Sequence, residues 1–199
     1  MSTKPDITRL IELQQLLQQL AQTERMCERR HHGSFVHEND TEHSYNLAMT
    51  AWFLAGHFPH LDRDRLIRLA LVHDLLEVHA GDTPVYADEA LLASKHEREV
   101  AAVEKLRREW QDFPELLEHI DSYESRESEE AKFVYALDKI MPIMLIYIND
   151  GRTWQQEGVT LDRLDGVKQG KVNLHPAVKV YYDQLYALLE DAPHLISPR

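Results

Sequence analysis

The sequence predicts an all-α fold, one compact helical domain of about six to eight helices. The 199-residue chain holds only seven glycines, and its long segments repeat apolar residues at the period of helices, without the alternating patterns and hairpin turns of strands. A chain of this length with 43% hydrophobic residues can bury one substantial core. We therefore expect a single domain over residues 1–199, with its core at about 7–190.

The first part of the chain predicts two helices with a polar loop between them. An amphipathic pattern of leucines and glutamines places the first helix at about 7–24. The polar stretch CERRHHGSFVHEND, residues 27–40, indicates a loop. Asp40 or Thr41 then suits the N-cap of a second helix, which continues to about His57.

Three further helices are expected in the middle of the chain. The third begins after residues 62–64 and ends near Gly81, because Pro84 blocks its continuation. The fourth, at about 87–110, is so rich in Glu, Lys and Arg that we expect a solvated face with i,i+4 ion pairs. The stretch FPELLEHIDSY, residues 113–123, predicts a short helix.

The C-terminal part begins with the most apolar helix of the chain. Residues 127–148 start with acidic side chains, which favour the first turn of a helix, and then become almost wholly apolar. The stretch NDGRTWQQEGV, residues 149–159, indicates a loop. A last amphipathic helix is expected at about 176–190.

Charge and composition exclude two classes of partner. With a formal charge of −12 and a pI near 5.4, the surface repels phosphate backbones and anionic lipids, so we expect neither nucleic acid nor membrane as a partner. The most apolar run, 133–148, is too short to span a bilayer and contains Asp138 and Lys139. The single cysteine, Cys27, and an N-terminus without a secretory pattern favour a cytoplasmic location.

Three segments are apolar all round, at 44–56, 66–76 and 133–148, and such helices are expected to be buried. Ionic groups resist leaving water, so any charged residue in or beside these segments needs a compensating partner. From Ser44 to Gly56 there is no charged residue and His43 stands at the edge, from Leu69 to Leu76 the ionisable residues are His73 and Asp74, and in 133–148 they are Asp138 and Lys139. These few residues are therefore the informative ones.

A shared divalent cation would compensate two imidazoles and two carboxylates together. Taken singly, His43 suits a helix cap, His73 and Asp74 a hydrogen-bonded core pair, and Asp138 an ion pair with its neighbour. Because all three helices show the same anomaly, the sequence predicts one metal site built from these four side chains. Mixed nitrogen and oxygen ligands disfavour Mg²⁺ and suit Mn²⁺, Co²⁺, Fe²⁺, Ni²⁺ or Zn²⁺.

Two further acids are expected beside this metal site. Glu77 follows His73 by four residues and Asp74 by three, so a continuous helix would place it on the same face, within reach of a metal-bound water. Asp82 stands where that helix opens into a loop, a position that suits contact with a substrate.

In this order, the residues resemble the pattern of HD-domain metal-dependent phosphohydrolases. The matching stretches are ENDTEHS with His43, LVHDLLEVHAGDT with His73 and Asp74, and YALDK with Asp138. The resemblance covers roughly residues 7–190, and it is closest to the small bacterial branch similar to 5′-deoxynucleotidases.

The resemblance implies an all-helical HD-domain fold that holds one divalent metal ion through four ligands: His43, His73, Asp74 and Asp138. It implies Glu77 as the catalytic acid or base beside the attacked phosphorus, and Asp82 as a residue that contacts the nucleotide or assists catalysis. The implied activity is that of a 5′-nucleotidase, which hydrolyses (deoxy)nucleoside monophosphates through a metal-activated water. A homodimer is implied as well.

The sequence departs from that pattern upstream of His43. The deoxynucleotidases place basic residues there, sometimes an Arg-Trp pair, whereas this chain has RRHHGSFVHEND. We expect Arg29 or Arg30 to bind the substrate phosphate, since guanidinium groups match phosphate oxygens. Tyr86, in the loop after Asp82, is either a structural aromatic or a surface on which a base stacks.

Two other functions stay open at this point. Some HD proteins are di-iron oxygenases with additional histidines, and His79, His96 and His119 lie in the relevant interval. Alternatively, the fold serves as a non-catalytic module that binds a nucleotide. The complete set of predicted ligands favours the hydrolase over both.

Overall fold

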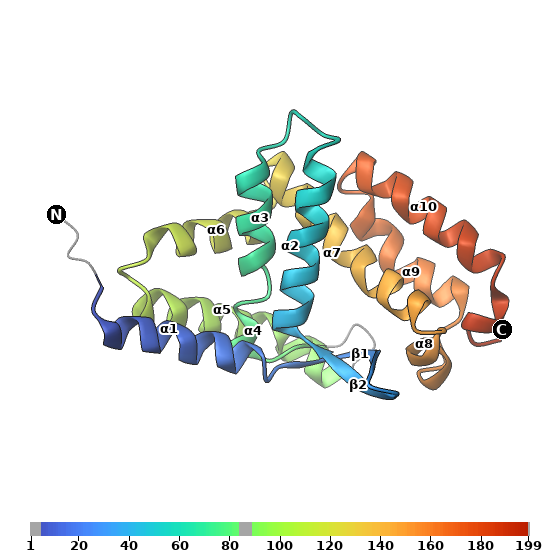
Figure 1. Ribbon diagram of the computed structural model, residues 1–199, viewed down its shortest axis with the longest axis horizontal. Coiled ribbons are helices and arrows are strands. Elements are labelled where there is room, and N and C mark those ends of the chain that lie inside the picture. Colours follow the sequence, from blue (N-terminus) through green and yellow to red (C-terminus); the bar gives the residue numbers. More distant parts are fainter. Residues whose placement is uncertain (1–4, 84–88, 199) are drawn as a thin grey trace.

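The computed structural model describes residues 5–83 and 89–198, which are mostly helical (Figure 1). The helices are α1 Ile7–Leu20, α2 Asp40–Ala55, α3 Arg63–Val72, α4 Glu77–Ala80, α5 Glu89–Glu109, α6 Pro114–Ser125, α7 Glu129–Ile148, α8 Arg152–Gln156, α9 Leu161–Val172 and α10 Pro176–Glu190, with a 3₁₀ turn at Pro193–Leu195. Helices α2, α3 and α7 pack together, with α1, α4, α5 and α6 on one side and α8 to α10 on the other. The all-α prediction is confirmed, with more helices than expected.

A small hairpin occupies the segment that the sequence predicts as a loop. Its strands β1 (Glu24–His31) and β2 (Ser34–Asn39) pair in antiparallel fashion. The turn consists of His32 and Gly33, whose φ values of 46° and 85° suit a two-residue hairpin. The loop prediction is wrong because these strands are mostly polar, so only their pairing reveals them. The first helix correspondingly ends at Leu20, before the hairpin begins.

The second helix begins one residue earlier than predicted. Asn39 is its N-cap and forms a capping box with Glu42, since the Asn39 side chain accepts a hydrogen bond from the Glu42 amide and the Glu42 carboxylate accepts one from the Asn39 amide. Asp40 is therefore free of the capping role. It is fully buried and faces the interior of the molecule.

The third helix is interrupted where the sequence predicts a continuous one. Helix α3 ends at Val72, and α4 begins only at Glu77. Between them the chain tightens, because the amides of Leu75 and Glu77 each donate to a carbonyl three residues back. The apolar pattern gives no sign of this break, because Val72 before His73 and Leu75 after it belong to the same core cluster.

Helix α2 is not buried all round, which corrects the prediction for residues 44–56. Leu47 and Ala51 are fully buried, but the opposite face leaves Trp52 53% and Phe53 70% exposed. Helix α7 fulfils its prediction, with ten buried residues along 20 positions. Apolar composition alone does not distinguish a helix with two buried faces from one that keeps an uncharged face open.

Helices α8 and α9 lie in the C-terminal part, α8 within the predicted loop and α9 where no helix is expected. Gly151 begins α8 with a φ of +69°, and a Cβ there would lie 2.0 Å from the Leu195 carbonyl oxygen, so only glycine fits. Helix α9 packs against α7, which brings its lysines to the centre of the molecule. Within the described ranges, none of the helices is long and apolar enough to cross a membrane.

Candidate active site

Three helices bring the predicted metal ligands together. His43 lies in the first turn of α2, His73 at the C-cap of α3, and Asp138 in the middle of α7. The His43 Nε2 atom lies 2.9 Å from Asp138 Oδ1, and His73 Nε2 lies 3.8 Å from the same oxygen. All three side chains are buried, and each offers a ligand atom within 4.8 Å of the others.

The backbone and a neighbouring carboxylate orient the two imidazoles. His73 Nδ1 lies 2.8 Å from the carbonyl oxygen of Ala70, which fits donation from Nδ1 and leaves the Nε2 lone pair free. That Nε2 is buried without a hydrogen-bond partner among the described residues. Glu38 Oε2 lies 3.3 Å from His43 Nδ1. Such second partners of metal-binding histidines fix the tautomer and turn Nε2 toward an ion.

Asp74 approaches the same His73 nitrogen as Asp138 does and is held by an arginine. Its Oδ2 atom is 3.0 Å from His73 Nε2 and accepts a hydrogen bond of 2.5 Å from Arg25. Burial would raise the pKa of the Asp74 carboxyl, but the charges of His73 and Arg25 outweigh it and hold this pKa below its usual range. Asp74 is therefore ionised and ready to serve as a ligand.

Asp138 is fixed from its other side. Its Oδ2 atom accepts hydrogen bonds from Lys139 Nζ at 2.5 Å and from the Tyr123 hydroxyl at 3.3 Å, while Oδ1 faces the imidazoles. Although burial disfavours the imidazolium, hydrogen bonds to Asp138 and Glu38 raise the pKa of His43 to about 9. The cluster thus stabilises a positive charge at its centre, which a cation can supply in place of a proton.

Glu77 and Asp82 lie beside Asp74 and line the same pocket. Burial, and then the charges of Asp74 and Asp82, raises the pKa of Glu77 to about 11. Burial also raises the pKa of Asp82 above its usual value. One turn of helix α4 carries Glu77, and Arg98 holds the following loop by donating to the Ala80 carbonyl and, at 2.8 Å, to the Thr83 hydroxyl.

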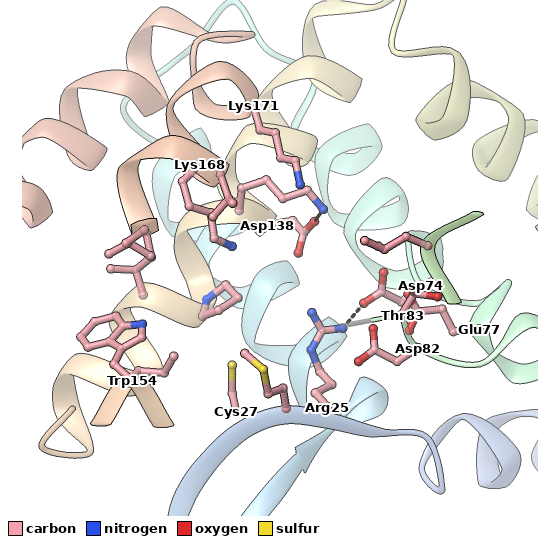
Figure 2. A pocket seen from close by; sticks show the side chains of 18 of the residues that line it. Arg25, Cys27, Asp74, Glu77, Asp82, Thr83, Asp138, Trp154, Lys168 and Lys171 are labelled. Atoms are coloured by element: carbon pink, nitrogen blue, oxygen red, sulfur yellow. Dashed lines mark hydrogen bonds and ion pairs between the residues drawn. The ribbon is translucent and has the colours of Figure 1, made fainter. Parts of the chain in front are cut away.

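The pocket itself has a volume of about 510 Å³ and two chemically different walls (Figure 2). Asp74, Glu77 and Asp82 form one wall, and Lys168 and Lys171 extend from the opposite one. An apolar part of the lining includes Met26, Pro142, Ile143, Ile146, Trp154 and Leu164. A pocket with charged walls and an apolar floor suits a ligand that carries both an anionic group and an apolar ring.

The basic residues of the hairpin lie differently from the prediction. Arg29 pairs with Glu42 and Arg30 with Asp150, and neither residue lines the pocket. Arg25 lies in the pocket instead, where it donates to Asp74 and, at 3.0 Å, to Asp40. The sequence does contain polar residues, Thr23 and Glu24, just before Arg25, where the first helix ends. Because the predicted helix extends to residue 24, Arg25 is not recognised as part of the polar segment that follows it.

The additional histidines and the predicted aromatic lie elsewhere. His79 is 3.1 Å from Glu109, His119 bonds to the backbone of Glu115, and His96 is exposed. Over residues 5–83 and 89–198, the side-chain groups able to hold a metal include none of these histidines. Tyr86 lies outside the described residues.

The residues at this site fit a divalent metal ion. The buried His73 Nε2 atom faces two carboxylates without a hydrogen-bond partner among the described residues, and His43 and Asp138 complete a mixed nitrogen and oxygen set. The carboxylates of Asp40, Asp74 and Glu77 also lie within 4.8 Å of one another, but the Arg25 guanidinium already supplies positive charge there. The histidine cluster is thus the stronger place for an ion.

Comparison with known proteins agrees with this geometry. The chain is 38% identical over 109 residues to a curated 5′-deoxynucleotidase HDDC2 of Bos taurus, a match that covers 54% of this chain and 52% of that protein. The chain thus spans about half the length of that relative. The corresponding human protein is 31% identical over 152 residues, covering 75% of this chain and 72% of its own length.

A solved structure shares the whole fold. It is a protein of Magnetospirillum magnetotacticum MS-1 described as a predicted metal-dependent phosphohydrolase, with a TM-score of 0.79, 28% identity and complete coverage of both chains. The model of the HD domain family matches residues 17–179, which include His43, His73, Asp74 and Asp138. The chain therefore belongs to the HD domain family.

Proposed function

We propose that this protein is a divalent-metal-dependent phosphomonoester hydrolase, a 5′-nucleotidase that acts on deoxynucleoside monophosphates. The observation that carries the proposal is the cluster of His43, His73 and Asp138, with Asp74 3.0 Å from His73, beside a pocket of about 510 Å³. The pocket joins this cluster to an apolar lining, as a phosphate and a base require. The names of the curated relatives, 5′-deoxynucleotidases, support the choice of substrate.

The proposed roles follow from the placement of each residue. His43, His73, Asp74 and Asp138 would hold one divalent ion of Mn, Co, Fe, Ni or Zn, for which their mixed donor set is suited. When bound, the ion supplies Lewis acidity, which lowers the pKa of water and polarises a phosphoryl oxygen. Asp138 keeps its Oδ1 directed at the imidazoles because Lys139 and Tyr123 hold its Oδ2.

Glu77 is the proposed catalytic acid or base. Its carboxyl lines the pocket beside Asp74, and its Oε2 atom is buried without a hydrogen-bond partner among the described residues. The raised pKa of Glu77 means that this carboxyl can hold a proton at neutral pH and exchange it with a reacting oxygen. Asp82 lies near Arg25 in the acidic part of the pocket lining, and we propose that it contacts the substrate.

Of the hairpin arginines, Arg25 and not Arg29 or Arg30 is the one that lines the pocket. It lies at the edge of the acidic wall, while Arg29 and Arg30 form ion pairs outside the pocket lining. We propose that Arg25 positions Asp74 and offsets negative charge when an anionic substrate enters.

A phosphate-release assay tests the proposed activity. The purified protein is incubated with Mn²⁺ or Co²⁺ and a panel of deoxyribonucleoside and ribonucleoside 5′-monophosphates. We expect phosphate release from the deoxynucleotides and none from an Asp74→Ala control. If a folded, metal-loaded protein binds nucleotides but releases no phosphate, the fold serves as a binding module. If metal analysis finds two irons per chain, the oxygenase alternative replaces the hydrolase.

We also propose that two copies of the chain form a homodimer through the exposed face of α2. Tyr45, Met49, Trp52 and Phe53 form that face, and all are exposed, between 44% and 70%. Helix α2 carries no Asp, Glu, Lys or Arg from Ser44 onward, whereas the chain has a net charge of −12. A second copy is the favoured partner because a two-fold axis places uncharged face against uncharged face and keeps the acidic surfaces apart.

A further inference from the structure

Two lysines of α9 reach into the pocket from the side opposite the acidic wall. Lys168 and Lys171 are three residues apart, so they lie on the same face of the helix. Both line the pocket, and Figure 2 shows them extending toward Asp138 from the side opposite Asp74 and Glu77. Helix α9 has no predicted role in the site, and the assigned metal ligands and acids do not involve it.

Lys168 is buried although no acid pairs with it. Its residue is only 8% exposed, and no hydrogen bond or ion pair to Lys168 or Lys171 forms within the described part of the chain. Asp138, the carboxylate whose charge favours the Lys168 ammonium, is already engaged by His43 and Lys139. Burying an ammonium group without a partner is costly, and the cost is offset when an anion binds beside it.

The surroundings of Lys168 disfavour its positive charge while no anion is bound. Burial, followed by the charge of Lys139, lowers the pKa of Lys168 to about 8, and the same two causes lower the pKa of Lys171. Lys139 of α7 lines the same pocket, but its ammonium group already donates to Asp138. Lys168 and Lys171 are thus two like charges on one wall, and they remain together most favourably around an anion that carries more than one negative charge.

We propose that Lys168 and Lys171 form the phosphoryl-binding wall of the pocket and select dianionic phosphate esters, which rests on the function proposed above. The acidic wall and the histidine cluster receive a cation, and the lysine wall receives the phosphate, so the phosphoryl group lies between the two. Lysine ammonium groups bind phosphate oxygens through charge-assisted hydrogen bonds. Because the lysines contact the phosphate and not the ring, they determine affinity for phosphate in both substrate and product.

Binding of inorganic phosphate tests the lysine wall without any turnover. Calorimetric titration in the presence of Mn²⁺ compares the wild-type protein with Lys168→Met, Lys171→Met and the control Lys179→Met. The control removes a partly exposed lysine of α10 that pairs with Asp183 and does not line the pocket. We expect each pocket substitution to weaken phosphate binding by about tenfold to a hundredfold and the control to leave it within about twofold, as the loss of one charge-assisted hydrogen bond predicts.

Two further measurements separate binding from folding. Lys168→Arg keeps the charge and is expected to retain most of the phosphate affinity, which a merely structural defect would not explain. A deoxynucleoside without phosphate is expected to bind all variants alike. The proposal is wrong if the wild-type protein binds no phosphate, or if both pocket variants bind it as the wild type does.

The failure of this proposal is distinguishable from failure of the proposed function. If phosphate binding depends on the two lysines but no nucleotide is hydrolysed, the lysine wall stands and the nucleotidase activity does not. If nucleotides are hydrolysed with unchanged KM in Lys168→Met and Lys171→Met, the activity stands and the lysine wall does not. We expect KM to rise in these variants while kcat changes less.

Discussion

The Nε2 atom of His43 lies 2.9 Å from Oδ1 of Asp138, although 95 residues separate them in the chain. This contact joins the first turn of α2 to the middle of α7, and His73 Nε2 lies 3.8 Å from the same oxygen. Two imidazoles and a carboxylate in the interior are more stable around a shared positive charge than apart. Replacing a single proposed ligand should therefore weaken metal binding at this cluster.

Asp74→Ala is expected to remove the metal and the activity together while the protein stays folded. The carboxylate supplies one of the four proposed ligands, and its loss also removes one of the acidic partners of Arg25. We expect phosphate release to fall by more than about a hundredfold, beyond the effect of losing an outer-shell partner. Metal analysis and circular dichroism measure the two effects. Asp64→Ala, at an exposed position in the first turn of α3, is the matched control, and full turnover by Asp74→Ala would refute the assignment.

Glu77→Gln is expected to keep the metal and lose turnover. The amide preserves the size of the side chain but cannot take up or release a proton, and general acid–base catalysis contributes about 10² to 10⁴ in rate. Steady-state kinetics together with metal analysis check this expectation. A variant that hydrolyses nucleotides at the wild-type rate would show that another group carries the proton.

Lys168→Met is expected to stabilise the metal-free protein at pH 7. The folded-state pKa of about 8 lies below the ordinary value of 10.5, so folding weakens proton binding, and the penalty is complete below pH 8. Stability should therefore rise as the pH climbs from about 8 to 10.5. The difference between the two pKa values corresponds to about 3 kcal/mol, an upper limit for the gain.

Urea denaturation at pH 7 and at pH 10.5 measures this effect. We expect the stabilising effect of Lys168→Met to be larger at the lower pH and to decline at the higher one. A variant that is less stable than the wild type at pH 7 would indicate a structural role for the ammonium group. If Lys168→Met makes the protein more stable and weakens phosphate binding, Lys168 contributes to binding at a cost in stability.

Arg25 and Arg30 are expected to differ in their effect on stability. Arg25 is largely buried and joins Asp40 to Asp74, so Arg25→Ala leaves two carboxylates uncompensated and should cost about 3 kcal/mol or more. Arg30 and its partner Asp150 are both more than half exposed, so Arg30→Ala should cost less than about 1 kcal/mol. Chemical denaturation gives both values. Equal costs would contradict the placement of Arg25 in the pocket.

Phe53→Glu is expected to convert the proposed homodimer into a monomer. The substitution puts a charge into the uncharged face of α2, where two copies would bring the same charges together. Sedimentation measures the oligomeric state. Val180→Glu is the control, since Val180 is 54% exposed on α10, outside that face. If Val180→Glu dissociates the dimer and Phe53→Glu does not, the interface lies on α10 and the proposed α2 interface is wrong.

The sequence by itself determines the helical class and the identity of the central polar residues. Helical periodicity is local, and an ionisable residue such as His73 or Asp138 in an apolar run is visible without any structure. The sequence also predicts that the three apolar helices pack together, whereas the contact between their polar residues depends on which helix faces meet. The metal ion, the roles of Glu77 and Asp82 and the cytoplasmic location remain predictions.

Only the tertiary structure decides which arginine and lysine side chains line the pocket. The polar hairpin has no clear strand period, so its register, which places Arg25 in the pocket and Arg29 and Arg30 outside it, depends on pairing with residues up to 15 positions away. The exposed face of α2 and the lysines of α9 likewise depend on which neighbours cover each helix. Burial is a property of packing between distant segments, and a local pattern records only which faces are able to be buried.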